Sequence, residues 1–90
     1  MSHWSPCKRR EFVRRLRVLG FDGPFFGTRH QFMTFGGHRL TIPSNEEFSI
    51  PQLRFMLQEV TDITGRLLSV DDWNALYFGS DRHRLAPMLP

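Results

Sequence analysis

The spacing of apolar residues changes twice along this 90-residue chain, and these changes restrict the folds that it can adopt. Between residues 12 and 19 the apolar residues recur every three or four positions, as on one face of a helix. Between residues 24 and 43 the period falls to two, as in strands, and over residues 53–63 the helical spacing returns. A helix, a group of strands and a second helix are therefore expected in that order.

Residues that start helices set the expected helix boundaries. Ser5-Pro6 has the form of an N-cap followed by a first-turn proline, which predicts a first helix over residues 6–19. Ser49-Ile50-Pro51-Gln52 has the form of a capping box and predicts a second helix over residues 50–64. Each of the two expected helices is followed directly by a glycine, the residue that most often ends a helix.

Glycine and proline divide the middle of the chain into three strands. Strands are expected near residues 24–26, 30–35 and 39–42, and Pro43 ends the last one. Gly36-Gly37 supplies the positive φ angles that a two-residue hairpin turn requires. The expected fold class is therefore two-layer α+β in the order α-β-β-β-α, which double-stranded-RNA-binding domains also use.

The C-terminal part predicts one more short helix. Ser69 can cap this helix, and two aspartates then lie at its positively polarised end. Its apolar residues are Trp73, Leu76, Tyr77 and Phe78. They either cover the open end of a small core or dock a partner or a second copy, and the spacing of a single stripe favours the core. The tail over residues 79–90 is expected to fray.

Length and composition indicate one domain over residues 1–90, with a core at about 6–64 and a C-terminal helical extension at about 65–90. Cys7 is the only cysteine, so no disulfide framework is expected. The absence of a leading apolar run and of a long apolar segment favours a cytoplasmic protein with no membrane partner. No cofactor and no metal site are expected, because the four histidines are scattered without ligand-pair spacing.

Positive charge is concentrated in the first part of the chain. Residues 1–40 contain eight Lys/Arg against two acids (+6), whereas residues 41–90 contain four against seven (−3). Within the expected first helix a single acid, Glu11, offsets six bases, where a merely solubilising surface would mix the signs. This pattern favours binding to a polyanion such as RNA. The helix residues expected to contact RNA are Lys8, Arg9, Arg10, Arg14 and Arg17.

The segment Gly27-Thr28-Arg29-His30 places a histidine after a glycine turn, at the head of an expected strand. An imidazole of ordinary pKa, about 6.5, accepts protons near neutral pH and therefore suits acid–base chemistry on RNA. Arg29 and Arg39 can stabilise negative charge that develops on a phosphate. The competing interpretation of His30 is a strand-edge histidine that bonds to the backbone.

Taken in order, these pieces resemble the HicA family of toxin–antitoxin modules over roughly residues 8–60. The resemblance rests on the basic helix Lys8-Arg9-Arg10-Glu11-Phe12-Val13, Leu19-Gly20-Phe21, the Gly27-Thr28-Arg29-His30 turn, the Gly37-His38-Arg39-Leu40-Thr41-Ile42-Pro43 strand and the apolar second helix. The helix around Trp73 exceeds the minimal toxin and is similar to a longer subgroup with a C-terminal extension.

The resemblance implies a double-stranded-RNA-binding-domain-like fold and a metal-independent endoribonuclease (an mRNA interferase) that cleaves mRNA and is neutralised by a HicB-type antitoxin. It implies His30 as the catalytic residue, with Thr28 in place of the family's usual serine. RNA-binding residues then include Thr28, Arg29 and Arg39, and His38 at the hairpin tip is a possible second acid or base. The alternative function is a non-catalytic RNA-binding module on the same fold.

Four phenylalanines in the expected strands, Phe25, Phe26, Phe32 and Phe35, allow two interpretations. They can stack unpaired bases, as aromatic residues of other RNA-binding modules do, or they can belong to the core, which is commoner. Alternation places His30, Phe32 and Thr34 on one face and Gln31, Met33 and Phe35 on the other. Both faces contain apolar residues, so the pattern leaves the core-facing side open.

Overall fold

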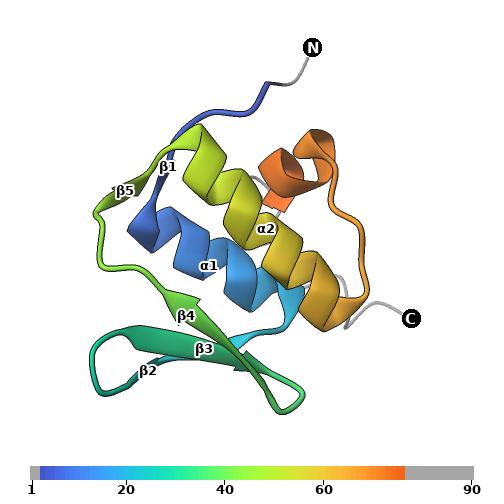
Figure 1. Cartoon of the computed structure of the whole chain (residues 1–90). Coiled ribbons are helices and arrows are strands. Elements are labelled where there is room, and N and C mark those ends of the chain that lie inside the picture. Colours follow the sequence, from blue (N-terminus) through green and yellow to red (C-terminus); the bar gives the residue numbers. More distant parts are fainter. Residues whose placement is uncertain (1–2, 77–90) are drawn as a thin grey trace.

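Two helices cover one face of a three-stranded antiparallel sheet in the computed structural model, which describes residues 3–76 (Figure 1). The elements are β1 (Cys7–Lys8), α1 (Arg9–Leu19), β2 (Asp22–Phe26), β3 (Gln31–Phe35), β4 (His38–Ile42), β5 (Glu47–Phe48) and α2 (Ile50–Thr64). A further helical segment covers residues 70–76. The α+β class is confirmed. No helix within the described part of the chain has the length and apolarity needed to cross a membrane.

The sheet has the order β2-β3-β4 expected of a meander. Met33 pairs with Leu40 across β3 and β4, and both side chains are buried beneath the helices. The neighbouring pair, Phe32 and Thr41, lies on the opposite face because successive strand residues point to opposite sides. The expected hairpin turn is confirmed at Gly36-Gly37, whose φ angles are +52° and +89°.

The first helix begins later than expected, and the prediction that Ser5-Pro6 caps it is wrong. Lys8 occupies the cap position in an extended conformation, without a side-chain hydrogen bond, and α1 starts at Arg9. The residues before it form β1, which pairs with β5, so that Cys7 lies opposite Phe48. Because of this pairing, residues 7–8 are extended and not helical. The two strands are far apart in the sequence, so no local pattern could have predicted their pairing.

The other two helix starts are confirmed. Ser49 Oγ accepts a hydrogen bond from the Gln52 amide at 3.3 Å at the start of α2, which has the bounds expected from the sequence. Ser69 caps the last helical segment: its Oγ accepts from the Asp72 amide and its own amide donates to Asp72 Oδ2, each at 3.1 Å. Tyr77, Phe78 and the tail over residues 79–90, where fraying was expected, lie outside the described residues.

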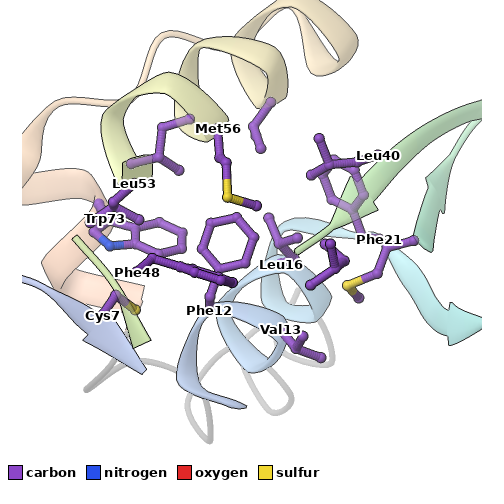
Figure 2. Packing of buried hydrophobic residues seen from close by; sticks show 14 of the residues in the cluster. Cys7, Phe12, Val13, Leu16, Phe21, Leu40, Phe48, Leu53, Met56 and Trp73 are labelled. Carbon is purple, nitrogen blue, oxygen red and sulfur yellow. The ribbon is translucent and has the colours of Figure 1, made fainter. Parts of the chain in front are cut away.

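An aromatic cluster joins α1, β5 and the last helical segment (Figure 2). The ring centroid of Phe12 lies 5.3 Å from that of Phe48, at an interplanar angle of 85°, and 5.5 Å from that of Trp73. All three side chains are at most 1% exposed. Trp73 and Leu76 are therefore core residues, as the stripe of the last helix predicted. The other fully buried side chains are Leu16, Met33, Leu40, Ile42, Leu53 and Val60.

Replacing Phe12 by alanine should destabilise the protein by about 3–5 kcal/mol, because it leaves a cavity between Phe48 and Trp73. Urea denaturation measures this loss. Phe55→Ala is the matched control, since Phe55 is 69% exposed on α2 and its truncation should change stability by no more than about 0.5 kcal/mol. Equal losses in the two variants would contradict the described core.

Burial raises the pKa of the Cys7 thiol from 9.0 to about 11, and this effect outweighs the lowering by Arg15. Because the thiolate is the reactive form, we expect iodoacetamide to label Cys7 slowly in native protein at pH 8 and quickly in urea. The folded state holds this proton more tightly than the unfolded state, so the free energy of unfolding should fall as the pH rises above about 9. Cys7→Ala should reduce this loss of unfolding free energy at high pH. An unchanged pH dependence in the variant would show that the Cys7 thiol does not cause it.

Candidate functional site

A tight turn between β2 and β3 positions His30. The Gly27 amide donates a hydrogen bond to the His30 carbonyl oxygen at 3.0 Å. A Cβ atom on Gly27 would lie only 2.5 Å from that oxygen, so the turn requires glycine for its close approach. Thr28, Arg29 and His30 are all exposed. The turn thus presents a hydroxyl, a guanidinium and an imidazole to solvent on consecutive residues.

A shallow hollow of about 280 Å³ extends from this turn over the outer face of the sheet, the face that the helices leave open. Its lining residues are Gly27, Thr28, Arg29, His30, Phe32, Arg39 and Thr41. Four residues proposed from sequence alone for catalysis or RNA binding therefore meet in one depression, although Arg39 comes from β4. Its lining contains no carboxylate. The hollow is accordingly suited to an anionic group beside an imidazole.

The structure shows which phenylalanines face outwards. Phe35 belongs to the helix-covered face, packs against the core and lies 5.1 Å from Phe21 between ring centroids. Phe25 and Phe32 lie opposite each other in register on the outer face, with their ring centroids 5.6 Å apart. Phe26, at the end of β2, is 87% exposed. The core interpretation is therefore confirmed for Phe35 and wrong for Phe25 and Phe26, while base stacking stays a prediction.

Arg39 extends this outer aromatic surface. Its guanidinium carbon lies 4.2 Å from the centroid of Phe32, which is cation–π contact. Arg39 forms no ion pair with an acid among residues 3–76. From the sequence, Phe32 was left between base stacking and the core, and Thr41 was not selected, although both lie on the strand face that His30 and Arg39 share. Their alternation with Met33 and Leu40 was the available signal, but it left open which of the two sets faces the helices.

A second and larger depression, of about 680 Å³, runs between α1 and β2. We call it the cationic groove; it is lined by Arg9, Arg10, Glu11, Val13, Arg14, Arg17 and Pro24. It contains four of the five helix bases expected to contact RNA. The fifth, Lys8, lines a neighbouring depression together with Arg10.

Several of these arginines also stabilise the fold. Arg9 donates from Nε to the Pro43 carbonyl oxygen at 3.0 Å and from Nη2 to the side-chain oxygen of Gln31. Arg17 donates from Nε to the Gly23 carbonyl oxygen at 2.9 Å. These contacts attach α1 to the sheet and keep the guanidinium groups at the wall of the groove.

The remaining bases differ in how they are engaged. Arg14 forms an ion pair with Glu11 at 3.0 Å within α1. The side chains of Lys8, Arg10 and Arg29 form no hydrogen bond or ion pair with another residue in the described range. These three cations are therefore the most available for an external anion.

His38 does not reach the hollow. It pairs with Phe35 at the far end of β3, whereas His30 directly precedes the first residue of that strand. Five strand residues separate the two ends, which corresponds to about 16 Å at the usual rise per residue. The second acid–base role considered for His38 requires both imidazoles at one phosphate, and the structure does not bring them together.

The described residues contain no cluster of three or more His, Cys, Asp or Glu side chains arranged to hold a metal ion. Comparisons with protein-family models, with curated proteins and with solved structures found no match to this chain. The geometry of the hollow and the groove, and the resemblance of their motifs to the HicA family, are therefore what indicates a function.

Replacing Gly27 by alanine should displace the His30 turn and cost about 1–3 kcal/mol, since the added carbon meets the backbone oxygen of His30. Amide resonances of residues 27–31 should shift, as measured by two-dimensional NMR. Gly36→Ala is the control: it carries strain from a φ of +52° but meets no atom within 4 Å. Resonances at the His30 turn that stay unchanged in Gly27→Ala would show that the turn is more tolerant than its geometry requires.

Proposed function

We propose that this protein is a metal-independent endoribonuclease of the HicA type that cleaves mRNA in the cytoplasm. The observation that best supports the proposal is the meeting of Thr28, Arg29, His30 and Arg39 in one hollow. The arginine-lined groove along α1 adds a surface for the rest of the RNA strand. The order α1-β2-β3-β4-α2, with both helices on one face of the sheet, agrees with the double-stranded-RNA-binding-domain-like fold that we propose for it.

In this mechanism His30 removes the proton from a ribose 2′-hydroxyl. The freed oxygen attacks the adjacent phosphorus, the bond from phosphorus to the 5′-oxygen breaks, and the products are a 2′,3′-cyclic phosphate and a 5′-hydroxyl. The departing oxygen takes its proton from water or from the imidazolium that the first step formed. General acid–base catalysis of this kind contributes about 10²–10⁴-fold.

The other residues of the hollow bind and polarise the phosphate. Arg29 and Arg39 stabilise the additional negative charge of the pentacoordinate transition state, with no carboxylate in the lining to compete for them. The Thr28 hydroxyl donates a hydrogen bond to a phosphate oxygen.

The bases of α1 and its cap residue Lys8 hold the flanking phosphates. Lys8 and Arg10 have no described side-chain partner to give up, so phosphate contact costs them little. Such contacts are independent of sequence and weaken steeply with salt. A HicB-type antitoxin that covers His30 and the cationic groove would block chemistry and binding together.

A non-catalytic RNA-binding module is the second candidate. One observation favours it: the hollow contains a single imidazole and no carboxylate, so it offers one group for two proton transfers. Under this alternative the arginines bind phosphates and His30 has no chemical role.

Replacing His30 by alanine should reduce cleavage of single-stranded RNA by about 10²–10⁴-fold, because the proton acceptor is lost. RNA affinity, measured by fluorescence anisotropy, should stay within about twofold, since the phosphate-binding cations remain. His38→Ala is the control and should cleave normally. The cleavage products should carry 2′,3′-cyclic phosphate ends.

The possible outcomes separate the two candidates. Cleavage that persists in His30→Ala would exclude His30 as the base. Unmodified protein that binds RNA without cutting it, after any co-purifying antitoxin has been removed, would favour the binding module.

A further inference from the structure

We propose that an outer aromatic row, formed by Phe25, Phe32 and the guanidinium of Arg39, binds an unpaired RNA base by stacking, so that the ligand is single-stranded rather than duplex RNA. The row crosses all three strands of the sheet on the face opposite the helices. The proposal rests on the proposed function only in identifying RNA as the ligand.

The row presents aromatic and guanidinium groups on the face of the sheet opposite the helices. Phe25 is 44% exposed although it is a large apolar side chain, and its ring lies at 40° to that of Phe32. The Arg39 guanidinium lies over the Phe32 ring, so the row offers a planar cation there, beside the exposed ring of Phe25. Nucleobases stack on both aromatic rings and guanidinium planes, and every base has such a face.

The row and the hollow share residues. Phe32 and Arg39 belong to both, and Thr41, which pairs with Phe32, also lines the hollow. A nucleotide whose base stacks on the row therefore has its own backbone beside the hollow that contains His30. Binding of one base would in this way select the phosphate that is presented to the imidazole.

Charge favours RNA over a protein as the occupant. Arg39 belongs to the row and Arg29 lines the adjoining hollow, and neither has an acidic partner among residues 3–76. A protein surface that covered the rings would have to bury these cations or supply carboxylates, whereas a nucleotide brings an aromatic face and an anion together. A duplex offers no free base face, because its bases are already stacked and paired.

The test measures the affinity of His30→Ala protein, which leaves RNA intact, for a short fluorescent single-stranded RNA and for the same sequence as a duplex. Adding Phe25→Ala should weaken single-strand binding about 5- to 100-fold and leave duplex binding unchanged. The salt dependence should not change, because no phosphate contact is removed. Phe25→Trp should bind at least as tightly as the parent, and Phe55→Ala, which removes an exposed ring from α2, should have no effect.

Cleavage assays with protein that retains His30 separate this inference from the proposed ribonuclease. If RNA is cut but Phe25→Ala binds single strands normally, the aromatic row is excluded and the ribonuclease stands. If Phe25 is needed for binding but RNA is never cut, the row stands and the ribonuclease fails. Three results would overturn the row. In the first, Phe25→Ala loses affinity equally for duplex and single-stranded RNA. In the second, Phe25→Ala weakens binding only to a partner protein, and in the third the parent protein binds no RNA.

Discussion

The alternation of side chains along β3 is the constraint on which both the hydrophobic core and the candidate site depend. Met33 faces the helices and is fully buried, whereas its neighbour Phe32 faces outwards beneath Arg39. A shift of one residue in register would exchange the two faces. The Gly27 turn at one end of the strand and the Gly36-Gly37 hairpin at the other hold this register. The same five-residue strand therefore contributes to the core and to the candidate site.

Much of the fold could be predicted because its signals are local. The capping serine and the helical spacing defined α2, and the Gly-Gly pair defined the hairpin between β3 and β4. The start of α1 could not be predicted in this way. Cys7, which was expected in the helix, instead pairs with Phe48 in a strand, and β5 is too short to produce an alternating pattern. Pairing between segments distant in sequence overrode the local Ser5-Pro6 signal.

The candidate site was predictable as a set of residues but not as a surface. The turn motif selected Thr28, Arg29 and His30, and the structure places Arg39 beside them. What the pattern left open was the direction of the strand faces, because Phe32 and Met33 are equally apolar. Only the packing of the helices on Met33 decides that Phe32 faces outwards. Likewise, charge alone could not distinguish Arg9, which is bonded to Pro43, from exposed Arg10.

Arg9 shows what this distinction implies for ligand recognition. Its backbone amide donates to the Glu46 carbonyl oxygen at 2.8 Å, while its guanidinium binds Pro43 and Gln31. One residue thus connects the start of α1 to the loop after β4 and to the first residue of β3, directly after His30. These contacts fix the spacing between the cationic groove and the hollow. A flexible single strand can bend so that its phosphates reach both surfaces. A stiff polyanion such as a duplex can do so only if its own phosphate spacing already matches the distance between them.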